Sequence, residues 1–177
     1  MKNKISTNKL VITALFAALA CVATMIINVP IPATKGYINV GDTIVLLSAW
    51  IIGGWYGAIA AGIGSALADI ILLATYFAPG TLVIKFLMAI VASLIYVRFN
   101  KINVNKYVGY IVSAIVSEAI MILGYFLYES IILGYGLGAV PAILGNIIQA
   151  IGSIILAVAT IVVLEKSKTV DLIKKNI

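Results

Sequence analysis

The sequence predicts an all-α integral membrane protein: one bundle of six transmembrane helices, with both termini in the cytoplasm. Of its 177 residues, 63% are hydrophobic and 10% are charged, whereas soluble domains are about 45–50% apolar and about 25% charged. At about 20 residues per crossing, six helices and short loops use the whole length, so residues 1–177 form a single membrane domain. We expect it in the bacterial cytoplasmic membrane.

Charge placement is the third observation, because basic residues accumulate on the cytoplasmic side of a membrane. Six crossings place ten of the twelve basic residues on one side. These ten are Lys2, Lys4, Lys9, Arg98, Lys101, Lys106, Lys166, Lys168, Lys174 and Lys175. An odd number of crossings would put one basic end on the external side. The net charge of +6 therefore reflects the topology of the chain rather than nucleic-acid binding.

The first helix is expected at residues 10–28. A cleaved signal peptide is the alternative, but its apolar region is usually about 7–15 residues long and ends at a small-residue cleavage site. Here the apolar run covers 10–27 and leads into NVPIPATKG. Prolines and glycines then make 29–42 too broken for a helix, and we expect an external loop there.

The other five helices are separated by turn and charge signals. GGWYG (53–57) divides a short second helix, 43–55, from a third, 57–76, and its Trp55 and Tyr56 suit the membrane interface. YFAPGT (76–81) precedes a fourth helix at 82–97, and the basic RFNKINVNK loop (98–106) follows it. A fifth helix, 107–128, and a sixth, 139–164, flank the YESIILGYGLG turn.

Two charges lie inside these apolar helices. Asp69 falls in the outer half of the third helix, and Lys85 falls near the outer end of the fourth. A charge at a helix centre in the bilayer costs at least about 2.5–3.5 kcal/mol, and pairing lowers that cost. The short turn between the two helices lets the pair approach, either as a structural ion pair or as part of a binding site.

Other polar residues point to the same depth. Glu118 and Tyr125 share a face of the fifth helix, and Asn146, Gln149 and Ser153 form a stripe on the sixth. These residues could instead have purely structural roles, as interhelical hydrogen bonds or, for Asp42, as the N-cap of the second helix. Convergence at one depth favours a cavity instead. The predicted substrate-binding residues are Asn39, Asp42, Asp69, Tyr76, Lys85, Glu118, Tyr125, Asn146 and Gln149.

Several kinds of chemistry have no residues to support them. The sequence has no G-x-x-x-x-G-K-[ST] phosphate loop and no histidine, which excludes that route to ATP binding and zinc or serine–histidine proteolysis. We therefore expect no catalytic residues, no metal site and no cofactor. An intramembrane enzyme using Asp69 or Glu118, or an accessory membrane subunit, remains the alternative to a binding protein.

Residues 36–89 resemble the substrate-binding S component of energy-coupling factor (ECF) vitamin transporters. The resemblance rests on GYINVGD (36–42), GIGSALAD (62–69) and YFAPGTLVIK (76–85). It implies high-affinity capture of a vitamin or its precursor outside the cell, with 29–42 as a lid. It also implies partners, namely a membrane coupling subunit and two cytoplasmic ATPase subunits, with Ala14 and Ala18 on the docking surface.

The branch of this family that the motifs suggest takes riboflavin, pyridoxine or hydroxymethylpyrimidine. Charged groups, amides and tyrosines suit a small ring that carries hydroxyls. Pyridoxine or hydroxymethylpyrimidine is therefore the expected cargo, with riboflavin or another vitamin as the alternative.

Overall fold

The computed structural model describes residues 6–31 and 34–177. Lys2 and Lys4 of the predicted basic end, and 32–33 of the predicted lid, lie outside the described residues. Within the described residues, five helices are long and apolar enough to cross a membrane, which makes this a helical multi-pass membrane protein. They are α1 (Thr7–Ile26), α3 (Gly54–Ile71), α4 (Ala78–Lys101), α5 (Lys106–Leu127) and α6 (Val140–Lys166).

The remaining apolar helix, α2 (Gly41–Ile51), is short and central. Its 11 residues extend about 16 Å at 1.5 Å per residue, roughly half of the 30 Å hydrocarbon core. Almost all of its side chains are buried, because α1, α3, α4 and α6 all pack around it. Trp50 anchors α2 to α5 through a 3.0 Å hydrogen bond from Nε1 to Ser113 Oγ. The short length leaves the sixth crossing an expectation.

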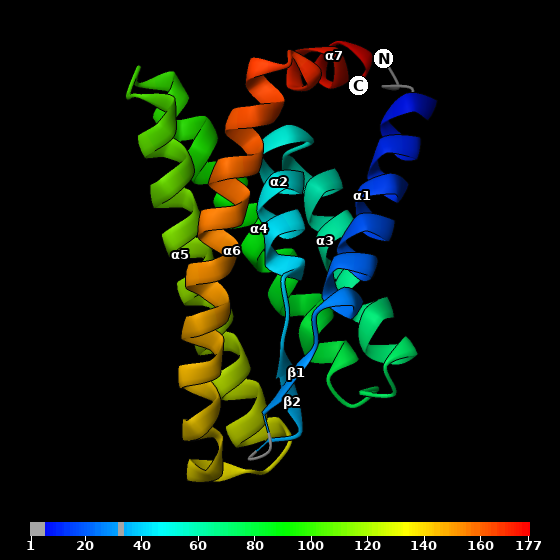
Figure 1. Cartoon of the computed structure of the whole chain (residues 1–177), viewed down its shortest axis with the longest axis vertical. Coiled ribbons are helices and arrows are strands. Elements are labelled where there is room, and N and C mark those ends of the chain that lie inside the picture. Colours follow the sequence, from blue (N-terminus) through cyan, green and yellow to red (C-terminus); the bar gives the residue numbers. More distant parts are fainter. Residues whose placement is uncertain (1–5, 32–33) are drawn as a thin grey trace.

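A small antiparallel hairpin occupies part of the predicted lid, where the sequence analysis expected no regular structure. Strand β1 (Val29–Ile31) pairs with β2 (Gly36–Ile38), with Val29 opposite Ile38. Valine, isoleucine and tyrosine favour this extended backbone. The hairpin lies against α6, where a Cβ on Gly145 would sit only 2.7 Å from the Ile31 side chain. The absence of a side chain at Gly145 therefore lets the hairpin close on the bundle (Figure 1).

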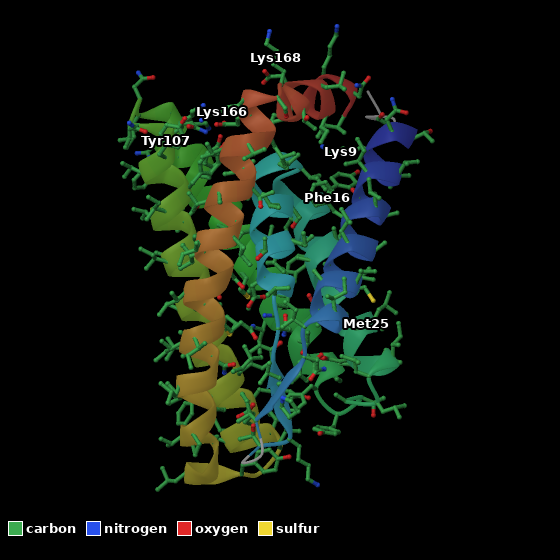
Figure 2. The ribbon with its side chains drawn as sticks, in the orientation of Figure 1. Lys9, Phe16, Met25, Tyr107, Lys166 and Lys168 are labelled. Carbon is green, nitrogen blue, oxygen red and sulfur yellow. The ribbon has the colours of Figure 1, made fainter. Side chains whose placement is uncertain are left out.

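The bundle has two unlike ends. We call the end with β1, β2 and the N-termini of α4 and α6 the hairpin end, and the end with residues 6–9 and α7 the terminal end (Figure 1). Helix α7 (Thr169–Asn176) follows the last helix that the sequence predicted, and it lies across the terminal end with Val170 buried. Lys9, Lys166 and Lys168 also lie at the terminal end (Figure 2).

Small residues allow the helices to approach closely. A Cβ on Gly64 would lie 2.2 Å from the backbone oxygen of Ala17 in α1, and one on Gly62 would lie 2.8 Å from that of Leu82 in α4. Helix α3 is thus held between α1 and α4 by backbone-to-backbone packing, the usual way apolar helices associate in lipid. This packing fixes where Ser65 and Asp69, on the next turns of α3, point.

Candidate substrate-binding pocket

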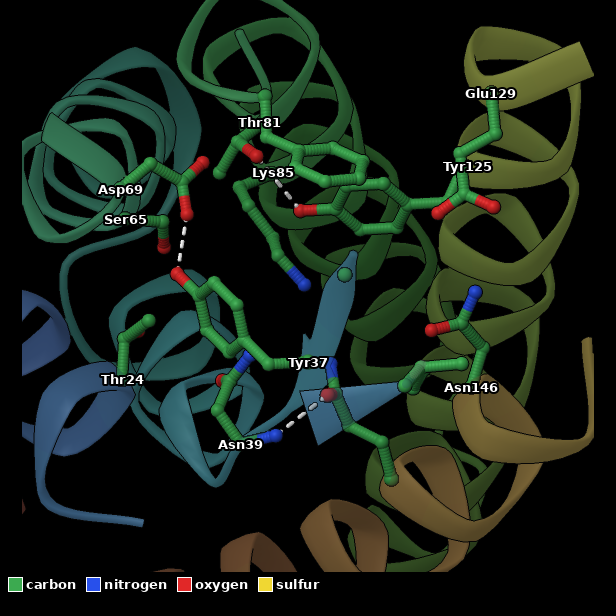
Figure 3. Close-up of a pocket in the computed structure, with 14 residues that line it drawn as sticks. Thr24, Tyr37, Asn39, Ser65, Asp69, Thr81, Lys85, Tyr125, Glu129 and Asn146 are labelled. Carbon is green, nitrogen blue, oxygen red and sulfur yellow. Dashed lines mark hydrogen bonds between the residues drawn. The ribbon is translucent and has the colours of Figure 1, made fainter. Parts of the chain in front are cut away.

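A polar pocket lies inside the hairpin end, under β1 and β2 (Figure 3). It encloses about 430 Å³ of space free of protein atoms, counting its open mouth. Residues from the hairpin and from α1, α3, α4, α5 and α6 converge on it. The lining consists of Thr24, Ile31, Gly36, Tyr37, Asn39, Ser65, Asp69, Phe77, Thr81, Lys85, Tyr125, Glu129, Asn146 and Gln149.

One side of the pocket is formed by Tyr37 of β2 and Asp69 of α3. The Tyr37 hydroxyl donates a hydrogen bond to Asp69 Oδ1 (Figure 3). Burial raises the pKa of the Tyr37 phenol above its ordinary value, and the Asp69 carboxylate raises it further. The phenol therefore keeps its proton and ties the hairpin to α3. The predicted Asp69–Lys85 ion pair is wrong, because Asp69 bonds to Tyr37 and Lys85 has another partner.

That partner is Asp42, at the start of α2. The Lys85 ammonium forms an ion pair with Asp42 Oδ1, and Gln149 Nε2 donates to Asp42 Oδ2 over 2.6 Å. Gln149 Oε1 in turn accepts a 2.8 Å hydrogen bond from the backbone N–H of Asn39. This chain links α4, α2, α6 and the end of the hairpin.

The role predicted for Asp42 as an N-cap is also wrong. The residue at the N-cap position is Val40, and Asp42 uses both of its oxygens in the buried chain instead. Asp42 is fully buried and lies behind the pocket wall rather than in the lining. Its contribution to the pocket is indirect, through the positions of Lys85 and Gln149.

Two more predicted site residues do not line the pocket. Tyr76 is 39% exposed, and its hydroxyl lies 3.3 Å from the carbonyl oxygen of Lys35, to which it donates. It lies in the turn before α4, which points it outward over the hairpin. Glu118 is buried in α5, two turns below Tyr125, too deep to reach the lining.

Polar atoms in the lining are left without partners. Within residues 6–31 and 34–177, Ser65 Oγ, Asp69 Oδ2 and Glu129 Oε2 are buried and accept or donate no hydrogen bond. Asn146 is 95% buried, and its amide faces the pocket (Figure 3). Buried polar groups in native proteins are nearly always satisfied. The three unsatisfied atoms therefore indicate a site for water or for a polar ligand.

Aromatic rings complete the lining. The Tyr125 hydroxyl and Thr81 Oγ1 are 3.0 Å apart, and the Lys85 ammonium lies 5.1 Å from the centre of the Tyr125 ring. Phe77 stands edge-on to Tyr125, with ring centroids 6.4 Å apart. A flat ligand would find ring faces and edges on this side, opposite the carboxylate of Asp69.

Six of the predicted site residues line the pocket, namely Asn39, Asp69, Lys85, Tyr125, Asn146 and Gln149. Several other lining residues were not predicted from the sequence. Of those missed, Tyr37 and Thr81 stand inside the GYINVGD and YFAPGTLVIK motifs, which could have signalled them. Glu129 had no such signal, since it lies in a segment read as a turn. It is instead buried in a π-helical extension of α5 (Tyr128–Ile132).

The predicted docking residues lie elsewhere, on α1. Ala14 and Ala18 are both exposed, whereas Thr13, Phe16 and Ala20 on the opposite side of α1 are buried in the bundle. The exposed side of α1 is thus a strip in which alanines alternate with larger apolar residues.

Together, these features describe a helical multi-pass membrane protein with a polar pocket under a hairpin at one end of the bundle. A sequence model of the family described as "ECF-type riboflavin transporter, S component" matches residues 4–166. The chain therefore belongs to this family of substrate-binding transporter subunits, which are not enzymes. In addition, 130 residues are 36% identical to a Pyrococcus woesei protein described as "Uncharacterized protein in gap 3′ region", covering 73% of this chain and 83% of that one.

Proposed function

We propose that the chain captures a vitamin or vitamin precursor at the outer membrane face and delivers it to an ATP-driven importer. The observation that carries this proposal is the group of unsatisfied polar atoms inside one enclosed pocket. Three of the eight such atoms in the described chain, on Ser65 and Asp69 of α3 and on Glu129 in the extension of α5, line this one cavity.

The chemistry of the lining favours a planar ring that carries hydroxyl groups. Asp69 Oδ2 and Glu129 Oε2 are acceptors, which suits O–H donors on the ligand, and the Asn146 amide can both donate and accept. Tyr125 and Phe77 offer apolar surface to a ring. A dry site of this kind rejects an analogue that leaves its polar groups unpaired.

Two cargo candidates follow. Riboflavin combines a flat ring system with a hydroxylated chain, and it is the ligand in the name of the family whose model matches residues 4–166. Pyridoxine or hydroxymethylpyrimidine, the cargo expected from the sequence, also presents a ring with hydroxyls and is smaller. Riboflavin is the first ligand to test, because the family match covers most of the chain.

The orientation we propose puts the hairpin end outside the cell. Basic residues of the described chain gather at the terminal end, among them Lys9, Arg98, Lys101, Lys106 and Lys166, and such residues mark the cytoplasmic side. In this orientation, with six crossings and both termini inside, the pocket faces the outside of the cytoplasmic membrane. The hairpin then acts as the lid, with Tyr37 and Asn39 holding it closed.

The partners we propose are a membrane coupling subunit and two cytoplasmic ATPase subunits. The support is the exposed strip of α1 with Ala14 and Ala18, where small side chains allow another helix to approach closely. The chain itself has no phosphate loop, so ATP would be bound by other subunits.

The test is a panel of vitamins added to the detergent-purified chain, with thermal unfolding as the readout. A ligand at 100 times its Kd stabilises the folded state by about 2.7 kcal/mol, which at roughly 2–4 °C per kcal/mol raises Tm by about 5–10 °C. Stabilisation by one compound of the panel, without turnover, is the expected result. No shift with any vitamin would instead support an accessory subunit.

A matched pair of variants locates the ligand. Asn146→Leu removes a buried amide that lines the pocket, and about 1–3 kcal/mol per lost buried hydrogen bond predicts binding at least fivefold weaker. Ser153→Ala removes a buried hydroxyl from the same face of α6, outside the lining, and should leave the affinity unchanged. Equal effects of the two substitutions would argue against this pocket.

A further inference from the structure

A second cavity lies at the terminal end, far from the hairpin. It encloses about 740 Å³ free of protein atoms, counting its open mouth. Helices α1, α2, α4 and α7 and the turn after α2 surround it. Its lining consists of Lys9, Ala49, Trp50, Ile51, Ile52, Gly53, Ser93, Tyr96, Val97, Asn100, Lys174 and Ile177.

The rim of this cavity is basic. The Lys9 ammonium lies 4.6 Å from the centre of the Tyr56 ring, and the Lys174 ammonium lies 5.7 Å from that of Tyr96. Within the described residues, neither lysine forms an ion pair and no Asp or Glu side chain lines the cavity. Of the nearby carboxylates, Glu165 is already bonded to Lys106 and Tyr110, and Asp171 lies three residues before Lys174 on α7. Two lysines thus face one hollow, and neither ammonium is within ion-pair distance of a carboxylate of the described chain.

The floor of the cavity is apolar. Ala49, Trp50, Ile51 and Ile52, at the end of α2, are all buried and form its base. Helix α7 lies across the terminal end above the end of α2 (Figure 1), and residues of both helices line the cavity. A ligand that filled the hollow would need an apolar part against α2 and an anionic part between the lysines.

Aromatic residues beside the cavity mark its depth in the membrane. Trp55 is 68% exposed while its ring packs on Phe86, and Tyr56 lies under the Lys9 ammonium. Exposed Trp and Tyr at the ends of spanning helices settle at the level of the lipid headgroups. Lys9 is therefore held at headgroup depth, and the cavity opens where phospholipid phosphates lie.

We infer that this cavity binds one anionic phospholipid, with its phosphate between Lys9 and Lys174 and its glycerol region on the apolar end of α2. Basic pockets between helix ends suit anionic lipid headgroups. Bound there, the lipid bridges α1, α4 and α7 and so stabilises the terminal end. This inference is independent of the cargo pocket, which lies at the opposite end of the bundle.

The experiment compares thermal unfolding of the detergent-purified full chain with added phosphatidylglycerol, phosphatidylcholine or inorganic phosphate. We expect phosphatidylglycerol to raise Tm more than phosphatidylcholine, and the excess to shrink as salt screens the lysines. Inorganic phosphate should not reproduce the shift. Equal shifts with both lipids, an excess indifferent to salt, or the full shift with inorganic phosphate alone would each overturn the assignment.

Variants with the same loss of charge identify the site. Lys9→Gln with Lys174→Gln should weaken phosphatidylglycerol binding about 30-fold, since each basic residue near an anionic surface contributes roughly a fivefold factor. The control, Lys101→Gln with Lys175→Gln, changes two exposed lysines outside the lining and should bind as the unmodified chain does. Equal weakening in both double variants would mean general surface attraction and contradict the inference. If the cavity variant does not fold, the single Lys174→Gln variant on exposed α7 replaces it, with a fivefold loss expected.

Discussion

The buried pair of Asp42 and Lys85 predicts strong energetic coupling. Both side chains are almost fully buried, at 0% and 3% exposure. Removing one partner of such a pair leaves a buried charge uncompensated, which costs about 3–5 kcal/mol. Asp42→Asn and Lys85→Met are each therefore expected to destabilise the folded chain by this amount.

The double variant should be no less stable than either single variant, because it leaves neither charge behind. The expected coupling energy is thus about 3–5 kcal/mol. The assay is thermal unfolding of the ligand-free chain in detergent, where each single variant should lower Tm by about 6–20 °C at roughly 2–4 °C per kcal/mol. The double variant should melt no lower than either single variant, whereas independent effects would lower its Tm by the sum of the two losses.

The exposed pair of Lys106 and Glu165, with 46% and 19% exposure, provides the control cycle. Exposed pairs contribute about 0–1 kcal/mol, so its coupling should fall in that range. Additive losses at Asp42 and Lys85, or equal coupling in the two cycles, would refute the idea that this ion pair holds α2 and α4 together.

Three other substitutions test further parts of the structure. Glu118→Gln should keep or raise Tm in a thermal melt, because the described chain gives both buried oxygens of Glu118 no partner; a large drop would mean that its charge is needed. Gly64→Ala should destabilise the fold by about 1–3 kcal/mol, since its Cβ would lie 2.2 Å from a backbone oxygen of α1. The control, Gly152→Ala, places its Cβ in open space and should not destabilise the fold. Equal melting points of the two variants would refute the close packing. Ala18→Trp should abolish vitamin uptake in cells while purified protein still binds cargo, and lost binding would place Ala18 elsewhere.

Much of the helical pattern could be predicted because apolar runs and turn residues are local signals. The GGWYG turn, for example, lies where α2 gives way to α3, and the structure begins α3 at Gly54. The hairpin and α7 were missed because each depends on packing. Strand β1 has only three residues, too few for a period-2 pattern, and α7 is stabilised by the burial of Val170 at the terminal end.

The sequence predicted the depth of the site within the bundle, but it did not predict which side chains bond to one another. Polar residues in apolar helices signalled a shared cavity, and Asn146 and Gln149 both reach it. The pairing of charged side chains depends on the rotation and tilt of each helix. Rotation and tilt are set by contacts such as that of Gly64 with Ala17. Lys85 therefore meets Asp42, 43 positions away in sequence, rather than the nearer Asp69. Tyr37 was missed because the lid was expected to cover the pocket, not to contribute a hydrogen bond to it.

A structure of the chain determined with saturating riboflavin, and then with pyridoxine, tests the central claim most directly. The account predicts one vitamin beneath the hairpin, with its ring beside Tyr125 and its hydroxyls on Asp69, Glu129 and Asn146. A pocket that stays empty while the vitamin binds elsewhere on the bundle would contradict it.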